Sequence, residues 1–448
     1  FFQMKSKFLI PVFALFALFP GCEPALEKVE TEVLVIGAGT GAVAAGIQSA
    51  RSEAVTLLVN PLPWLGGMLT AAGVSATDGN HELPSGLWGE FRQLLRNHYG
   101  GPEALSTGWV SHTLFEPHIG EMYLRQLANA EDMLTVWDNS KLLSLSQTET
   151  GWEAKIDHSG ETFIVRTKII IDGTDLGDVA ALAGVEYNAG MDSHTESGEA
   201  MAPVKSNDIL QDLTYVAILK DFGEGQDKTI VKPASYNPEV FFCSCQTNCP
   251  EKEGVHACDK MLSYALLPNK KYMMKWPIEG NDYYANVLDL DEEQRDSVFT
   301  KAKEHTLNFV YYIQSELGYK HLGLADDEFP TEDQLALLPY HREGRRIKGQ
   351  VRLNVNHILN PHRFNLYRTG IAVGDYPIDH HHDKNPEAPV IEFPKVPSYN
   401  IPLGCLITKE VDNFLVADKA ISVTNIVNGT TRLQPVILQI GQVAGAVA

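Results

Sequence analysis

Residues 376–383 carry the side chains best suited to proton chemistry. Their sequence is YPIDHHHD, in which three histidines stand between aspartates. A histidine that is oriented by a carboxylate is a good general base, because its pKa lies near neutral pH. Three histidines flanked by aspartates can also bind a metal ion, or lie in a loop without a role. The run is therefore a candidate catalytic segment with two alternatives open.

A second histidine, His341, lies in the basic run YHREGRR at residues 340–346. Its cations can hold an anionic substrate in a chain whose net charge is −21. A solvated basic turn is the alternative. We take His341 as the second candidate for the base.

Four cysteines form the third group with possible chemistry. Residues 243–249 read CSCQTNC, and Cys258 follows nine residues later. If the protein is exported, disulfides are the first expectation, followed by a zinc site of four thiolates and by an iron–sulfur cluster, with free thiols remaining open. Cys405 stands alone and is expected to be buried as a small apolar residue.

The elements that position these groups begin at Thr31–Asn60. An apolar strand, Val33–Ile36, leads into a G-x-G-x-x-A turn and a helix of small residues, and a second apolar run follows at 55–59. This βαβ pattern predicts a dinucleotide whose phosphates lie on the helix N-terminus. The predicted contacts of the turn are Gly37, Gly39, Thr40, Gly41 and Ala42. At the end of the second strand, Asn60 stands where an acidic residue usually contacts the ribose, and its amide can still hydrogen-bond a hydroxyl.

Three further turns present backbone or small residues in a similar way. Paired glycines at 66–67, followed by Met68, allow close approach to a flat ring or a phosphate. The run IIIDGTDLGDVA at 169–180 is a strand, a turn and a helix start, which favours ligand contacts from Gly173, Thr174 and Asp178. Near the C-terminus, a strand ends at Asp418, and a helix is expected to begin near 431–432 and to run to Ala448. Thr430 and Arg432 lie at the start of that helix.

These turns, taken together and in this order, resemble flavoproteins of the glutathione-reductase-like superfamily. The closest resemblance is to the bacterial FAD-dependent oxidoreductase family, whose exported members are often labelled xanthan lyase, and a more distant one is to heterodisulfide reductase-like proteins. The resemblance covers Thr31 to about Gly184 and about Gln334 to Ala448.

This resemblance implies FAD as the cofactor, with the C-terminal turn and helix closing over the flavin. The helix dipole and Arg432 would then stabilise negative charge on the reduced ring. A family pattern, Y-P-x-D-x-H, places the catalytic weight on Asp379 and His381, and the stretch around His341 resembles one beside the flavin. This chain has Asp418-Lys419 where the family usually has Gly-Arg or Gly-Asp.

The expected fold class is α/β. We predict a Rossmann-like FAD-binding domain built from residues 31–186 and 331–448, with an inserted α+β substrate domain at 187–330. Helical spacing predicts helices at 87–99, 117–129 and 291–317, and short strands are expected at 136–145, 152–156 and 162–165. The final helix has no cap, which predicts that the sequence is a fragment of a longer protein.

The N-terminal region resembles an export signal. Met4 is the expected start, and two lysines precede an apolar run at 8–19 that is too short to span a bilayer. The run ends in Leu18-Phe19-Pro20-Gly21-Cys22, like a bacterial lipoprotein signal of residues 1–22, and an ordinary cleaved signal is the alternative. We expect an exported protein, lipid-anchored through Cys22 in the periplasm or at the cell surface.

Composition and aromatic content complete the functional prediction. Apolar residues make up 44% and charged residues 21% of the 448 residues, as in a globular protein, and the net charge argues against nucleic-acid partners. We assign no residue to a metal site. The predicted reaction is oxidation of an alcohol group of a small substrate by hydride transfer to flavin, with an unknown electron acceptor. Aromatics that can stack on sugars make a carbohydrate the candidate substrate: Tyr264, Tyr272, Trp276, Tyr283, Tyr284, Tyr311 and Tyr312. A flavin-dependent lyase or isomerase and a non-catalytic binding protein are the alternatives.

Overall fold

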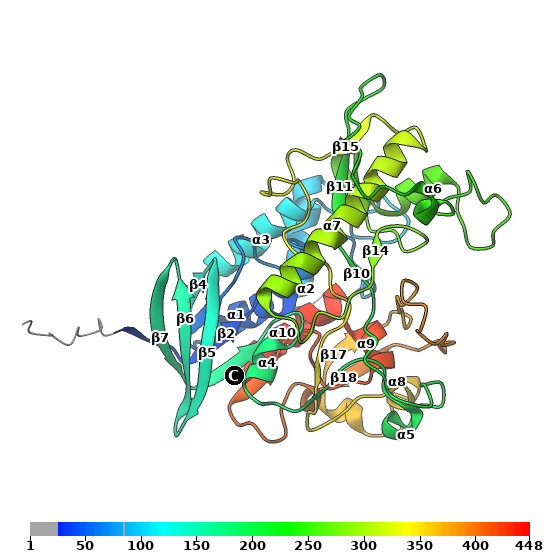
Figure 1. Cartoon of the computed structure of the whole chain (residues 1–448). Coiled ribbons are helices and arrows are strands. Elements are labelled where there is room, and N and C mark those ends of the chain that lie inside the picture. The colour runs from blue at the N-terminus through cyan, green and yellow to red at the C-terminus, as the bar shows by residue number, and fades with distance from the viewer. Residues whose placement is uncertain (1–25, 84–85) are drawn as a thin grey trace, which may run out of the picture.

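The computed structural model of this chain describes residues 26–83 and 86–448 (Figure 1). The predicted signal and its Cys22 therefore lie outside the described residues. Within the described part, none of the helices combines the length and the apolar character that crossing a bilayer requires.

A five-stranded parallel sheet forms the centre of the fold. Its order is β19 (Phe414–Val416), β8 (Ile169–Asp172), β2 (Val33–Ile36), β3 (Thr56–Val59) and β4 (Leu134–Trp137). Every residue of β2 and β3 is buried, as expected of parallel strands covered on both faces. Strand β19 comes from the C-terminal part and pairs with β8. The prediction of a Rossmann-like α/β sheet built from both ends of the chain is therefore confirmed.

Two helices from opposite ends of the sequence pack together on this sheet. They are α1 (Thr40–Arg51) and α10 (Gln434–Val447). A Cβ at Gly441 would overlap the carbonyl oxygen of Gly41, and one at Gly445 would overlap that of Ala45. The small residues predicted to pack closely thus bring the two backbones into direct contact.

The helix expected from about 431–432 to Ala448 is α10, which begins slightly later. A short helix that was not predicted, α9 (Asn425–Thr431), precedes it, so that Thr430 lies in α9 and Arg432 at its C-cap. Helix α9 ends at Arg432, Leu433 is extended, and α10 begins at Gln434 with Pro435 in its first turn. Proline has no backbone N–H and is tolerated in the first turn but not in the interior of a helix, so the chain restarts there. The earlier helices, α2 (Gly86–Tyr99) and α3 (Pro117–Asn129), lie where helical spacing predicted them.

A second sheet flanks the first, with the order β1-β7-β6-β5. It consists of β1 (Glu27–Glu30), β5 (Ser140–Thr148), β6 (Gly151–His158) and β7 (Glu161–Thr167). The last three form an antiparallel meander, and β1 adds to β7 in parallel. The single strand predicted at 136–145 is wrong in one respect, because it is divided between β4, which ends at Trp137 in the parallel sheet, and β5, which begins at Ser140. In Figure 1 these strands stand at the left-hand side of the molecule, and Lys141 on β5 forms an ion pair with Glu292 of the inserted region.

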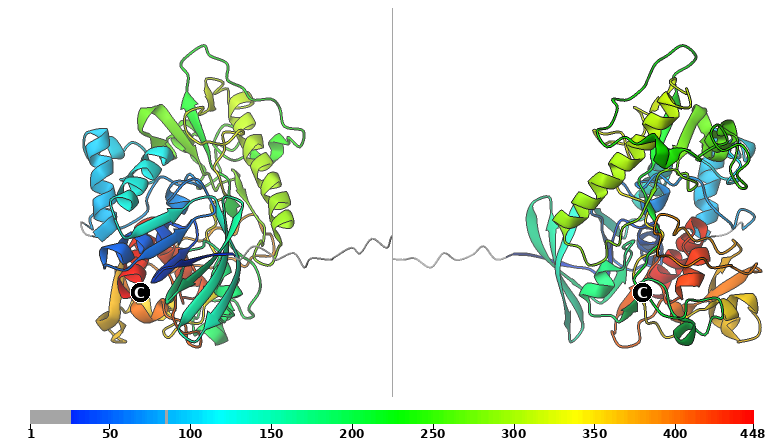
Figure 2. Two further views of the ribbon diagram at one scale, coloured as in Figure 1. Left: turned by 90° about the vertical axis from the view of Figure 1, so that its left-hand side faces the viewer. Right: turned by 45° about the vertical axis from the view of Figure 1, so that its right-hand side comes forward.

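The inserted region contains an antiparallel sheet and one long helix. The sheet has the order β12 (Leu266–Leu267), β13 (Lys271–Met274), β11 (Ala217–Asp221) and β15 (Leu322–Leu324), and a pair of short strands, β10 (Leu213–Thr214) and β14 (Asp282–Tyr283), lies apart from it. Helix α7 (Glu292–Ser315) begins with a capping box between Asp291 and Gln294. Figure 2 shows α7 running along one side of this region. The predicted domain boundaries at 186 and 330 stay predictions.

The shorter elements connect these layers. They are α4 (Asp178–Leu182), β9 (Tyr187–Asn188), α5 (His194–Ser197), α6 (Cys258–Leu262), β16 (Arg346–Ile347), α8 (Val355–Leu359), β17 (Gly370–Gly374) and β18 (Tyr399–Pro402). Strands β9 and β16 pair with each other, as do β17 and β18.

The clustered cysteines form two disulfides in the inserted region. Cys243 pairs with Cys249, and Cys245 pairs with Cys258. With all four sulfurs in disulfides, the zinc and iron–sulfur alternatives do not describe this structure. Cys405 is free and buried, and burial raises the pKa of its thiol to about 12.

Candidate active site

The predicted dinucleotide turn lies where the turns after β2, β8 and β19 meet, a region that we call the glycine junction. Gly37 has a φ of +137°, and a Cβ there would overlap the backbone of Gly173. The amide of Gly39 donates to the carbonyl oxygen of Gly173 at 3.1 Å. A Cβ at Gly41 would overlap the carbonyl oxygen of Ala417. Close packing of the protein's own backbone therefore already requires these glycines.

A buried carboxylate occupies the N-terminus of α1 at this junction. The amide of Gly41 donates to Oδ2 of Asp418 at 2.8 Å, and Asp418 is fully buried. Burial raises the pKa of Asp418 to about 6, although the neighbouring Lys419 opposes this shift. Lys419 also forms a buried ion pair with Asp175. The helix N-terminus thus binds an anion in this structure, as its free N–H groups and dipole favour.

The paired glycines at 66 and 67 lie directly on the glycine junction. Gly66 and Gly67 have φ values of +104° and +53°. A Cβ at Gly67 would come within 2.8 Å of the backbone of Ala38, Gly39 and Thr40, and the hydroxyl of Thr40 donates to the carbonyl oxygen of Gly66 at 2.6 Å. Met68 is buried beneath this turn. The second predicted glycine motif therefore joins the first in space.

Asn60 is fully buried, and its amide is engaged within the chain. The amide nitrogen donates to the carbonyl oxygens of Leu62 and Trp64 and to Oδ1 of Asp138, at 2.7, 3.2 and 2.7 Å. These bonds fix the turn after β3. A ribose contact by Asn60 stays a prediction.

The other predicted cofactor residues also make contacts within the chain. Thr174 donates from its hydroxyl to Asp172 at 2.6 Å, and Asp178 pairs with Arg295 and Arg345. Thr430 is buried and donates to the carbonyl oxygen of Tyr376 at 2.6 Å. Their contact with a cofactor stays a prediction.

A cluster of charged side chains and one tyrosine, all buried except the partly exposed Asp379, links the C-terminal part of the chain to the inserted region. We call it the charged cluster, and its members are Asp78, Lys275, Asp282, Tyr340, Arg342, Asp379, His381 and Arg432. At its centre, Nδ1 of His381 lies 3.0 Å from Oδ2 of Asp282, and Nε2 lies 3.2 Å from Oδ2 of Asp379. His381 is thus held between two carboxylates, one of them the predicted partner Asp379.

Arg432 joins the predicted pair from the end of α9. Its Nη2 lies 3.0 Å from both the carbonyl oxygen and Oδ2 of Asp379, and its Nη1 donates to the hydroxyl of Tyr340. Burial raises the pKa of Asp379, but the charges of His381 and Arg432 outweigh burial and hold this pKa well below its usual range. Asp379 is therefore anionic at neutral pH. Three residues singled out in the sequence meet here.

Asp282 on β14 completes the surroundings of His381, and sequence reasoning missed it. Arg342 donates from Nη2 to both of its oxygens, at 2.9 and 3.2 Å. Burial raises the pKa of Asp282, but Arg342 and His381 outweigh burial and hold it well below its usual range. No pattern in the sequence marks this aspartate, because Asp282 and His381 lie far apart in the sequence and only the fold places them side by side.

His341 lies apart from this group. It is buried, and burial lowers its pKa to about 4. The charges that act on it are those of Asp175, Lys419, Arg295 and Asp178. Tyr340 and Arg342, on either side of His341, belong to the charged cluster. His341 itself contacts the ring of Phe299 on α7. The structure does not bring the two predicted bases together.

The cations of the basic run are already paired. Arg342 pairs with Asp282, Arg345 with Asp178 and Asp289, and Arg346 with Glu343 and Asp192. The run is therefore neither a solvated turn nor an open anion site. It ties the inserted region to the rest of the chain.

The histidines beside His381 face a different environment. His380 and His382 line a cavity of about 310 Å³ under residues 383–393. Burial lowers the pKa of His380 well below its usual range and that of His382 to about 4. His380 and His382 point to this cavity, whereas His381 points to Asp282 and Asp379. The three rings therefore do not converge on one point.

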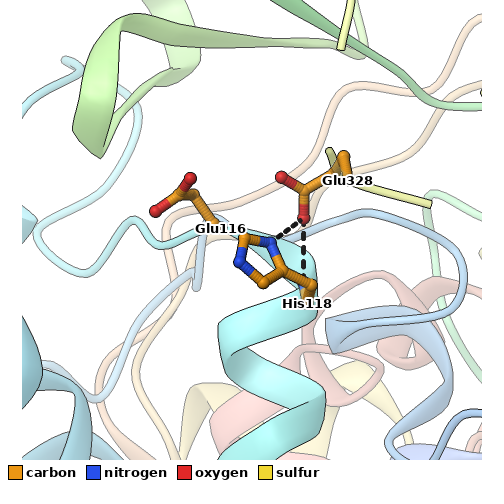
Figure 3. A group of neighbouring side chains, drawn as sticks. All are labelled: Glu116, His118 and Glu328. Atoms are coloured by element: carbon orange, nitrogen blue, oxygen red, sulfur yellow. Dashed lines mark hydrogen bonds and ion pairs between the residues drawn. The ribbon is translucent and has the colours of Figure 1, made fainter. Parts of the chain in front are cut away.

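A group with metal-ligand chemistry lies elsewhere, at the start of α3. Figure 3 shows His118 on the first turn of α3, hydrogen-bonded to Glu328, with Glu116 beside it. The ammonium of buried Lys271 lies 2.8 Å from each of the two glutamates. Lys271 compensates one of these negative charges, and hydrogen bonds from His118 to Glu328 and from Tyr99 and Asn269 to Glu116 engage the carboxylates further, so we assign the group a structural role.

Comparison with known protein families gives a match over most of the chain. Residues 32–448 match the family described as FAD dependent oxidoreductase, so the protein is an FAD-dependent oxidoreductase of that family. No curated protein sequence matches the chain.

Distant likeness to solved structures accompanies this match. CabE, an aromatic hydroxylase from angucycline biosynthesis, is 12% identical, with a TM-score of 0.32 over 46% of this chain and 39% of that chain. The p-nitrophenol 4-monooxygenase PnpA from Pseudomonas putida DLL-E4 is 11% identical, with a TM-score of 0.33 over 73% of this chain and 70% of that chain. Thioredoxin reductase from T. acidophilum is 14% identical, with a TM-score of 0.21 over 33% of this chain and 36% of that chain. We draw nothing about the reaction from these proteins.

The residues at the glycine junction fit FAD. The glycine turn leads into the N-terminus of α1, whose backbone donors and dipole suit a negative group such as a pyrophosphate. Gly41 already donates to the carboxylate of Asp418, so a pyrophosphate would use the other donors of the turn or displace this carboxylate. The Gly37–Ala42 turn, Gly66, Gly67 and Asp418 would hold the cofactor there. FAD, when bound, supplies the acceptor for a hydride.

Proposed function

We propose that this FAD-dependent oxidoreductase oxidises an alcohol group of a small substrate, with a carbohydrate as the candidate class. The observation that carries the proposal is the placement of His381 between Asp282 and Asp379. Bound FAD would accept the hydride of the substrate C–H bond, and the protein would take the proton of the hydroxyl. The product is a carbonyl compound, so atoms and electrons balance within one reductive half-reaction.

The two carboxylates assign the nitrogens of His381 different tasks. The side chain of Asp282 is 2% exposed, whereas that of Asp379 is 37% exposed, so Nδ1 faces the interior and Nε2 faces the accessible side. An Nδ1–H donated to Asp282 fixes the ring. Nε2 of the neutral ring can accept the proton when the substrate hydroxyl takes the place beside it that Oδ2 of Asp379 holds in this structure. After the transfer, anionic Asp379 stabilises the imidazolium. Arg432 holds Asp379 in place.

Location outside the cytoplasm, with a lipid anchor at Cys22, is part of the same proposal. The signal-like sequence of residues 1–22 supports it. The two disulfides also support it, because disulfides persist in oxidising compartments. The electron acceptor that reoxidises the flavin there stays unassigned.

Anaerobic reduction of the bound flavin by a panel of sugars and sugar acids tests the proposed reaction. Wild-type protein should lose its flavin absorbance with a substrate alcohol, and His381→Ala, with FAD still bound, should do so at least about 100-fold more slowly. The same measurement on His341→Ala decides between the two predicted bases, and the rate should fall far less there. Equal rates in wild type and His381→Ala would remove His381 from the reaction.

A further inference from the structure

Lys275 is a buried cation without an anionic partner. It follows β13 and is 5% exposed. Its ammonium nitrogen lies 5.2 Å from the ring centre of Tyr340, and no described carboxylate lies within 4.0 Å of it. Burying an ammonium without a carboxylate beside it is unfavourable. In a chain with 57 acidic residues, the lack of a partner beside His381 and its carboxylates needs an explanation.

Lys275 differs in this respect from the other cations around Tyr340. The guanidinium carbons of Arg342 and Arg432 lie 5.0 and 5.9 Å from the same ring centre, and each arginine has its own aspartate. Three cations thus surround one ring, and only two of them are neutralised by described residues. The third is available to a ligand anion.

Asp78 provides a hydrogen-bond acceptor in the same cluster. It is 8% exposed, and its Oδ1 has no hydrogen-bond partner among the described residues. Gln434, the first residue of α10, accepts from the amide of Asp78 and donates to the carbonyl oxygens of Val74 and Ala76, so this segment is fixed. Burial raises the pKa of Asp78 to about 6, and the charge that most opposes this is that of Lys275.

Contacts connect both groups to the segment around Arg432: Lys275 lies over the ring of Tyr340, whose hydroxyl accepts from Arg432, and the amide of Asp78 donates to Gln434. Asp78 and Lys275 act on one another electrostatically, yet they form no ion pair within 4.0 Å. Both also act on Asp379, the partner of His381. A ligand that carries an anion for Lys275 and a hydroxyl for Asp78 would satisfy both groups beside the proposed base.

We propose that Lys275 binds a carboxylate of the substrate and that Asp78 accepts a hydrogen bond from a hydroxyl of the same molecule, so that the substrate is a hydroxy acid and, among carbohydrates, a sugar acid such as a uronic acid. This inference rests on the proposed function, since it names the substrate class for the same site. Charge-assisted bonds to a buried ammonium are strong enough to select an acid over a neutral sugar of the same size.

Binding of matched ligands to the FAD-containing protein tests the inference. D-glucuronate, its neutral amide D-glucuronamide and D-glucose are titrated by calorimetry and by the change in the flavin spectrum. The acid should bind at least about tenfold more tightly than either neutral sugar, a difference of about 1.4 kcal/mol. Because the amide matches the acid in size, this comparison needs no variant.

Variants then assign the selectivity to one side chain. Lys275→Met should weaken binding of the acid at least about tenfold and leave the neutral ligands unchanged, whereas Lys275→Arg should retain part of the selectivity. Lys303→Met is the matched control, because Lys303 also lies 5.2 Å from a tyrosine ring centre, that of Tyr215, but pairs with Asp333 at 2.6 Å.

The outcomes separate this inference from the proposed function. Neutral sugars that reduce the flavin as well as acids do, with Lys275→Met behaving as wild type, would overturn the inference and leave alcohol oxidation standing. Acids that bind through Lys275 but never reduce the flavin would support the inference and overturn the proposed reaction. No selective binding of any acid by wild type would overturn the inference outright.

Discussion

The glycine junction and the charged cluster are built in opposite ways. At the junction, backbone fills the places that side chains would take, as at Gly37, Gly41 and Gly441. In the charged cluster, Oδ1 of Asp78 and Nε of Arg432 have no hydrogen-bond partner among the described residues, and the ammonium of Lys275 has no described carboxylate within 4.0 Å. Buried polar groups are normally paired, and exceptions call for a cause. The difference indicates that the junction fixes the frame, whereas the charged cluster is arranged for a ligand.

The largest expected effect is at the junction. In Gly41→Ala the added Cβ would overlap the carbonyl oxygen of Ala417, and backbone cannot move aside as a side chain does. We expect a loss of more than about 4 kcal/mol in the free energy of unfolding, or no folded protein. Gly46→Ala in the same helix is the control, because its Cβ would lie 3.3 Å from the flexible end of Leu134. Denaturant unfolding and FAD content measure both, and equal stability of the two variants would contradict close packing at the junction.

The next largest effect is a difference in stability between variants of a paired and an unpaired cation in the charged cluster. Arg342→Met leaves Asp282 buried without its partner and should lower the free energy of unfolding by about 3–5 kcal/mol. Lys275→Met removes a buried charge that has no partner among the described residues and should leave stability unchanged or raise it. Denaturant unfolding of both variants in the absence of substrate gives the comparison. A large loss in Lys275→Met would mean that Lys275 is paired within the protein.

A smaller effect depends on pH through Asp78. Its pKa is about 6 in the folded protein, against an ordinary value of 3.8, so the folded state binds the proton more tightly between these values. The stability contributed by the protonated form is therefore present at low pH and is lost as the pH rises through about 6. Asp78→Asn should match wild type near pH 4 and exceed it above pH 7, by at most about 3 kcal/mol. Unfolding at several pH values measures this difference.

Asp227 provides a control of opposite sign for that experiment. It is exposed, and hydrogen bonds from Thr229 lower its pKa. Its contribution to stability is present at neutral pH and lost on acidification, so Asp227→Asn should fall below wild type as the pH rises. If both variants became more stable relative to wild type as the pH rises, the Asp78 effect would not come from burial.

The local patterns of the sequence predicted much of the frame. The apolar strands, the glycine turn, helices α2, α3 and α7 and the meander all follow from short-range spacing. Helix α9 was missed, and the start of α10 was predicted two to three residues early. Asp379, His381 and Arg432 were named separately, and the fold brings them together.

The remaining members of the charged cluster have no such signal. Asp78, Lys275 and Asp282 lie on three separate segments, and only the tertiary arrangement places them around one site. The basic run shows the reverse problem, because its arginines suggested an anion site and each is paired with a carboxylate. Availability of a charge depends on its partners, which spacing along the sequence does not reveal.

A structure of the protein with FAD bound tests the central claim most directly. The account predicts the pyrophosphate at the Gly37–Ala42 turn, on the N-terminus of α1, and the isoalloxazine ring against the charged cluster with His381 facing the substrate side. An isoalloxazine ring bound away from His381 and Arg432 would contradict it.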